Sequence, residues 1–123
     1  MEDADIEEAF AALGRVTIRR MFGGKGVYHG GLIVAVVLGG ELRVKGDALS
    51  APALEAEGAR RWTYARPGRK PVAMPYWSLP EAAWDDPEAM ARWAREAYAA
   101  ALRAPPPARR RRSAAAQGPP PGV

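Results

Sequence analysis

Two glycine pairs, set nine residues apart, constrain the fold of this chain more than any other feature. Gly30-Gly31 and Gly39-Gly40 separate runs of strand-forming residues within the segment 19–45. Two-residue loops of this composition favour the tight primed turns of β-hairpins. The segment therefore predicts a three-stranded antiparallel meander with almost no residues to spare for loops.

The two turns also predict the register of the strands and the content of each sheet face. Counting outward from the turns pairs Tyr28 with Ile33, Val27 with Val34, Val37 with Leu42, and Ala35 with Val44. Side chains alternate along a strand, so they divide between two faces. The face expected to lie beneath helices carries Tyr28, Ile33, Ala35, Val37, Leu42 and Val44.

The opposite face of the meander is the candidate protein interface. It combines apolar side chains with a charged border, and an apolar patch of this kind marks a further layer or a partner surface. A homodimer through this face is one option, and a different protein partner is the other. The candidate interface residues are Val27, Val34, Val36, Leu38, Arg43 and Lys45.

The segments on either side of the meander predict two helices. Asp3 is placed to cap the first helix, and Gly14 is placed to end it. A short second helix, which carries Leu49, follows Asp47 and ends at Gly58.

The last helix has the clearest terminal signals. Asp86 is a favourable N-cap residue, Pro87 occupies the first helical position, and an acid follows, which is the order that capping and the helix dipole favour. The helix is expected to extend to about Arg103. Its apolar stripe consists of Met90, Trp93, Ala94, Ala97 and Ala101.

A second hairpin is predicted between the second and third helices. Residues 61–66 alternate, Pro67-Gly68 forms the turn, and residues 72–79 return. Pro75 in the returning strand indicates a sheet edge or a bulge, because proline cannot donate to the ladder. The resulting order, α-β-β-β-α-β-β-α, is that of an α+β fold in which helices cover an antiparallel sheet in two layers.

The charge distribution separates a folded domain from a tail. Residues 1–103 contain all fourteen acids and fourteen of the eighteen Lys and Arg, so this part has no net charge. The excess of +4 belongs to the arginine run 109–112. We expect one domain over 1–103 and a disordered Pro/Arg-rich tail over 104–123, because the tail lacks periodicity and bulky apolar residues.

The sequence predicts neither export nor a membrane span. The acidic N-terminus lacks the basic and apolar regions of a secretory signal. The longest apolar run, 32–38, has seven residues, whereas a spanning helix needs about 20. The chain has no cysteine, which fits a reducing compartment. We expect a cytoplasmic protein.

The residues offer no constellation for catalysis, and no enzymatic activity, cofactor or metal is expected. His29 is the single histidine, and without cysteine it lacks partners for a zinc site. The segment 23–26 has a superficial likeness to a phosphate-binding loop, which needs Ser or Thr after the lysine and then a helix. Here Gly26 follows Lys25, and a strand is expected next.

Aromatic and basic residues around the second hairpin leave two interpretations open. They could form a stacking platform for single-stranded nucleic acid, but in so small a domain core packing is the preferred interpretation for Trp62, Tyr64 and Trp93. Basic residues at the turn and in the tail make nucleic-acid binding the alternative function. The candidate contacts are Arg66, Arg69, Lys70, Arg109, Arg110, Arg111 and Arg112.

Three segments of the sequence are typical of one known family. They are Arg20-Met21-Phe22-Gly23-Gly24, Thr63-Tyr64 through Arg69, and Met74 with Tyr76 and Trp77. In these segments the chain resembles the N-terminal domain of the TfoX/Sxy proteins, regulators associated with bacterial competence genes. The resemblance extends over residues 5–103.

The resemblance implies a fold similar to type III secretion chaperones, in the element order given above. It also implies a non-enzymatic protein-interaction module linked to transcription, because known members act as co-activators with the cyclic-AMP receptor protein. Those members have a second, C-terminal domain, which this chain is expected to lack, and Pro75 stands where their pattern has a small polar residue. The expected partner is a transcription factor or the transcription machinery.

Overall fold

The computed structural model describes residues 1–21 and 23–105 of the 123-residue chain. Its α+β class and its order of helices and strands are those expected from the sequence, with one further strand at the start of the sheet. Nearly all of the expected tail, 104–123, lies outside the described residues. The helical elements are α1 (Asp3–Ala9), η1 (Ala11–Leu13), α2 (Ala51–Ala56), η2 (Glu81–Asp85) and α3 (Pro87–Arg103), and the strands are β1 (Thr17–Met21), β2 (Gly24–His29), β3 (Leu32–Leu38), β4 (Glu41–Lys45), β5 (Arg61–Tyr64) and β6 (Val72–Ser78).

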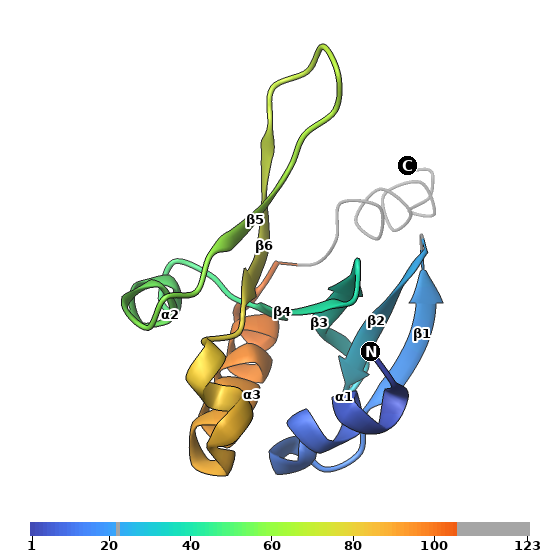
Figure 1. Ribbon diagram of the computed structural model, residues 1–123, viewed down its shortest axis with the longest axis vertical. Coiled ribbons are helices and arrows are strands. Elements are labelled where there is room, and N and C mark those ends of the chain that lie inside the picture. Colours follow the sequence, from blue (N-terminus) through green and yellow to red (C-terminus); the bar gives the residue numbers. More distant parts are fainter. Residues whose placement is uncertain (22, 106–123) are drawn as a thin grey trace, which may run out of the picture.

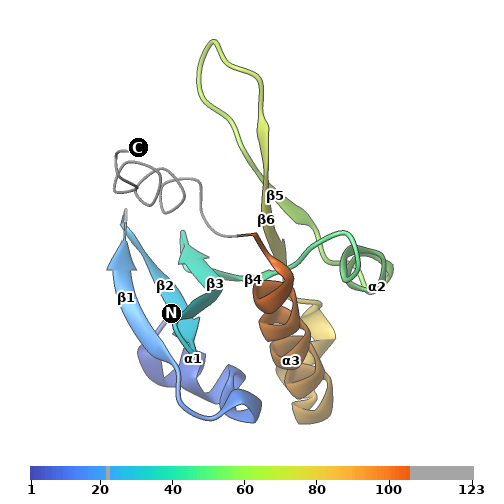
Figure 2. The same ribbon diagram turned by 180° about the vertical axis from the view of Figure 1, so that it is seen from behind.

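The six strands form one antiparallel sheet in the order β1-β2-β3-β4-β6-β5. α1 and α3 lie on one side of this sheet, and α3 packs across β3 and β4 (Figure 1). The β5–β6 hairpin projects beyond the rest of the molecule in both views (Figures 1 and 2). No helix of the described residues covers the opposite side of the sheet, which we call the open face.

The two glycine pairs adopt the predicted turns. Gly30 and Gly31 have φ values of 59° and 81°, and Gly39 and Gly40 have values of 59° and 77°. Positive φ at both central residues is the signature of the type I′ turn. The segment before the meander also pairs with β2, as β1, so the meander gains a fourth strand.

One extra residue in β3 changes the predicted register near the first turn. Tyr28 pairs with Ile33 as predicted, but Val27 pairs with Ala35 rather than with Val34. Such a β-bulge sets two residues of one strand against one residue of its partner. Val27, Val34 and Ala35 are therefore all buried in the core, whereas Tyr28 and Ile33 lie outside it. The prediction that Val27 and Val34 belong to the interface is wrong.

The core lies between the sheet and the helices. The predicted stripe of α3 is buried, and Trp93 is only 2% exposed, which confirms its role in the core. Truncating a buried side chain of this size costs about 3–5 kcal/mol. Ile6 of α1 and Phe10, which directly follows that helix, belong to the same cluster. No helix in the described part of the chain is long and apolar enough to cross a membrane.

α2 is shorter than the sequence indicates. It begins at Ala51, so Leu49 precedes it and is 73% exposed. Pro52 lies in the first turn, where its missing N–H has no helical partner to lose. Glu55 of this helix accepts a hydrogen bond of 2.8 Å from Nε1 of the buried Trp77, which ties α2 to β6.

The N-termini of α1 and α3 differ in how they are capped. Oδ1 of Asp86 accepts hydrogen bonds from the backbone N–H groups of Glu88 and Ala89, at 3.0 and 3.4 Å, so this residue caps α3 as predicted. Glu2 occupies the N-cap position of α1 without a side-chain capping bond. The carboxylate of Asp3, expected to cap that helix, instead pairs with Nζ of Lys25 at 2.6 Å.

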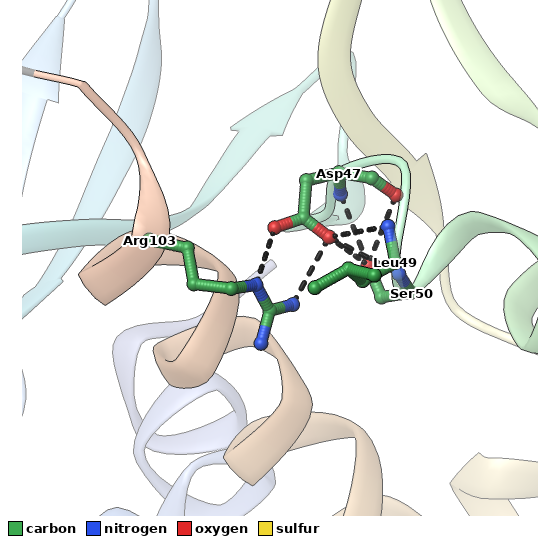
Figure 3. Close-up of polar contacts among 4 residues, drawn as sticks. All are labelled: Asp47, Leu49, Ser50 and Arg103. Carbon is green, nitrogen blue, oxygen red and sulfur yellow. Dashed lines mark hydrogen bonds and ion pairs between the residues drawn. The ribbon is translucent and has the colours of Figure 1, made fainter.

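An ion pair joins the end of α3 to the turn between β4 and α2 (Figure 3). Nε and Nη2 of Arg103 donate to the two carboxylate oxygens of Asp47 at 2.8 and 3.0 Å. The same carboxylate accepts the backbone N–H groups of Leu49 and Ser50, each at 3.1 Å. The Arg103 bond is the largest of the contacts that lower the pKa of Asp47 to about 2.

Pro75 lies beside a bulge and not on an edge strand. β6 runs between β4 and β5, and its register with β5 shifts between Arg61 and Thr63. The pairing with β4 stops at Tyr76, and the Pro75 carbonyl accepts the N–H of Gly46 at 3.0 Å. Proline is tolerated here because it lies beyond the residues that pair with β4.

Candidate interaction surface on the open face

The open face consists of alternate residues from neighbouring strands. Val36 pairs with Arg43, and Lys45 pairs with Tyr76, so each pair places its side chains on the same side of the sheet. The alternate positions, such as Val37 and Val44, point into the core. The open-face residues considered below are Arg19, Tyr28, Val36, Leu38, Arg43, Lys45, Trp62 and Tyr76.

Three cationic side chains on this face lie over aromatic rings. A cation within about 6 Å of a ring centroid is attracted by the ring, and the attraction strengthens as water is excluded. Each pair comes from two different strands, so the contacts run across the sheet. The pairs are Arg19 over Tyr28 at 5.5 Å, Arg43 over Trp62 at 5.6 Å, and Lys45 over Tyr76 at 5.3 Å.

A small apolar layer lies beneath these cations. Val36 and Tyr76 are 5% and 7% exposed, yet neither belongs to the main core cluster. The rings of Trp62 and Tyr76 are 6.4 Å apart and tilted by 50°. The side chains of the open face therefore cover one another, and the face presents a packed surface with charged groups on top.

The charge on this face is only partly neutralised. Nη2 of Arg43 pairs with Glu41 at 3.0 Å, whereas Arg19 and Lys45 form no salt bridge with any described residue. Burial lowers the pKa of Lys45, and the nearby charge of Asp47 opposes that effect. Burial also raises the pKa of Tyr76 to about 12, so its hydroxyl stays neutral. The open face is therefore cationic at neutral pH.

Four of the six candidate interface residues lie on this face. They are Val36, Leu38, Arg43 and Lys45, and all but Val36 are partly exposed. Val27 and Val34 lie in the core instead, because of the bulge.

The sequence interpretation missed the aromatic half of the surface. The predicted register places Tyr28 on the core face, because the sequence gives no sign of the bulge. Trp62 and Tyr64 were expected in the core, and that prediction is wrong, since Trp62 is only partly buried on the open face and Tyr64 is 46% exposed. The alternation of residues 61–64 indicates that Trp62 and Tyr64 share one face of a strand. It does not indicate which strand lies beside them, and therefore which side chain contacts Trp62.

Three of the candidate nucleic-acid contacts lie in the turn between β5 and β6. Arg66, Arg69 and Lys70 are exposed at the tip of the projecting β5–β6 hairpin (Figure 1). The guanidinium of Arg66 lies 6.0 Å from the ring of Tyr64. The tail candidates Arg109, Arg110, Arg111 and Arg112 lie outside the described residues.

The glycine-rich segment 23–26 runs into a strand, as expected. A cavity of about 460 Å³ beside it is lined by Gly23, Gly24 and Lys25 among others, but Nζ of Lys25 already bonds Asp3 and the carbonyl of Met1. A Cβ on Gly24 would collide with the carbonyl oxygen of Val37. Glycine serves close strand packing at this position.

His29 has a structural environment. Its Nδ1 lies 2.8 Å from the carbonyl oxygen of Arg15. Its ring meets Tyr98 of α3 edge to face, with centroids 4.8 Å apart. These contacts fasten the first hairpin turn to the loop before β1 and to α3.

Comparison with known proteins gives one family. A family model described as the TfoX N-terminal domain matches residues 8–101, which is most of the chain. None of the curated proteins compared with the chain matches it. The matched region contains every strand of the sheet and nearly all of α3.

Proposed function

Because this chain belongs to the TfoX N-terminal domain family, we propose that it is a cytoplasmic, non-enzymatic regulatory module that binds another protein through the open face. One observation carries the proposal, namely the three cation–aromatic pairs above a small apolar layer on the side of the sheet without helices. Tyr, Trp and Arg are the residue types that dominate the energetics of protein interfaces.

The chemistry of the face favours an acidic partner. Arg19 and Lys45 form no salt bridge with any described residue, and a partner that carries Asp or Glu would supply one. Complementary charge of this kind raises association rates and excludes wrong partners. The aromatic rings are already covered on one side by the cations, which leaves less ring surface for stacking of nucleic-acid bases.

The same charges disfavour a homodimer through this face. A two-fold dimer places the same patch of both copies together. Two copies of the open face would then set one cationic surface against another, and like charges repel. A different protein is therefore the preferred partner, and the family supports a link to transcription, in which a transcription factor or the transcription machinery is contacted.

Site-specific photocrosslinking in cells that express this protein tests the proposed function. A photoreactive phenylalanine analogue replaces Leu38 on the open face, and the matched control carries it at Leu49, which is 73% exposed in the turn between β4 and α2. We expect a protein of the transcription apparatus to be crosslinked from position 38 and not from position 49. Equal crosslinking from both positions, or none from position 38, would contradict the proposal.

Nucleic-acid binding through the hairpin tip is the second candidate function. The exposed positions of Arg66, Arg69 and Lys70 on a projecting hairpin favour it. It requires that the protein bind duplex or single-stranded DNA with an affinity that falls steeply as salt is added. The affinity must also fall when these three residues are replaced by glutamine. Binding lost only on replacement of the tail arginines would assign the activity to the tail.

A further inference from the structure

A groove opens at the helical end of the molecule, away from the open face. It has a volume of about 770 Å³ and is lined by Met1 and by residues of α1, η1, η2 and the start of α3. Figure 2 shows α1 and the start of α3 at the same end of the molecule. Its walls are mostly small apolar residues, and Trp84 and Met1 at its border are 44% and 38% exposed. Tryptophan exposed beside an apolar groove is typical of a binding surface.

The rim of this groove is acidic. Asp5 and Glu8 line it, and no Lys or Arg side chain does so among the described residues. The surrounding segments 1–14 and 79–91 hold nine of the fourteen acids of the chain and no Lys or Arg. Lys25 neutralises one of these acids, Asp3. An occupant of the groove must therefore combine apolar groups with positive charge.

The chain itself contains a segment of this chemistry. Residues 104–123 include six prolines and four arginines and no acid, with Pro105, Pro106 and Pro107 two residues before the arginine run. Proline-rich segments dock into aromatic-lined grooves, and arginine can stack on tryptophan while it pairs with carboxylates. The groove offers Trp84 for the first contact and Asp5 with Glu8 for the second.

The length of the chain decides which copy can place prolines 105–107 in the groove. α3 has 17 residues, so its C-terminal end lies about 25 Å from the groove at its start. Pro107 is three residues past Ala104 and can reach at most about 11 Å from it. Prolines 105–107 therefore cannot enter the groove of their own molecule.

We propose that the groove between α1 and α3 binds the proline–arginine segment 105–112 of a second copy of this chain. The contact is head-to-tail, so it links copies into open chains unless the rotation closes a ring. It is independent of the open face, and therefore of the proposed function.

The test titrates labelled synthetic peptides into a full-length receptor whose own tail cannot compete, with Arg109→Gln, Arg110→Gln, Arg111→Gln and Arg112→Gln. We expect the peptide 104–116 to bind and to weaken with added salt. The peptide 114–123, which has prolines but no arginine, is the matched control and should bind at least about tenfold more weakly, because it lacks the ion pairs and the cation–aromatic contact.

Variants of the receptor locate the site. Trp84→Ala should weaken binding by about fivefold or more, whereas Leu102→Ala, which removes an exposed apolar side chain at the other end of α3, should not. Asp5→Asn with Glu8→Gln should weaken it by about three- to tenfold, and Glu57→Gln should not. Undiminished binding to the groove variants, or no binding of peptide 104–116, would overturn the proposal.

The mass in solution tests the claim of a second copy. The mass of the natural chain, measured by light scattering, should rise with concentration. The mass of the variant with glutamine at positions 109–112 should rise less. Lys45→Glu should leave this difference unchanged, since the open face takes no part. A mass independent of concentration for the natural chain, or binding of peptide 114–123 as tight as that of 104–116, would overturn the head-to-tail contact.

Discussion

At the scale of single residues, Asp47 has the densest set of contacts in the described structure. Its carboxylate receives two bonds from Arg103 and two from backbone N–H groups (Figure 3). The first pair connects α3 to the sheet, and the second shapes the turn into α2. Asp47 is close to Lys45 as well, so it connects the end of the helix to the border of the open face.

Replacement of Asp47 separates these two roles. Asp47→Ala should lower the free energy of unfolding by about 1–2 kcal/mol, because it removes acceptors for both the guanidinium and the turn. Asp47→Asn should cost less, since the amide oxygen still accepts the backbone bonds. Urea unfolding of these variants, each with and without Arg103→Gln, measures the coupling. A coupling of zero between positions 47 and 103 would show that the ion pair adds no stability.

The lowered pKa of Asp47 gives a pH dependence of definite sign. Its value in the folded protein, about 2, lies below the ordinary 3.8, so the charged form is favoured by folding. The stabilisation is fully present above about pH 4 and is lost as the pH falls towards 2. Urea unfolding of the natural chain and of Asp47→Asn should therefore differ more at pH 6 than at pH 2.5. A difference that grows on acidification contradicts this assignment.

At the scale of elements, the glycine turns determine the meander. Gly40 has a φ of 77° and nothing within 4 Å of a Cβ placed there, so only its backbone conformation restricts the residue. Gly40→Ala should cost about 1–2 kcal/mol, because an L-residue is strained at positive φ.

Gly40→Asn is the matched control, because asparagine tolerates this region better, and it should cost less than the alanine variant. Thermal unfolding of the two variants measures the difference. An equal loss of stability in the two variants would show that the turn conformation is not its cause.

The elements also show how far the sequence could be interpreted. The glycine pairs, the alternation and the Asp86 cap are local signals, and each predicted its element. The bulge at Val34 has no local signal, because nothing in the apolar run 32–38 marks which residue is left unpaired. It moved Val27 and Val34 into the core and Tyr28 out of it. The position of Trp62 beside Tyr76 depends on the order of strands in the sheet, which spacing along the chain does not determine.

At the scale of the whole molecule, opposite charges occupy separate regions of a domain with no net charge. The open face carries cations above aromatic rings, and the groove at the helical end has an acidic rim. Each region is complementary to a different partner, an acidic protein for the first and a proline–arginine segment for the second. Such a distribution gives one small domain two independent contacts and no strong overall field.

A charge-reversal crosslink tests most directly whether the open face binds the partner. The photoreactive residue stays at position 38, and the background carries either Arg19→Glu with Lys45→Glu or, as the control, Arg66→Glu with Arg69→Glu at the hairpin tip. We expect the crosslinked product to disappear in the first background and to persist in the second. A product that survives reversal of Arg19 and Lys45 would contradict binding through the cations of the open face.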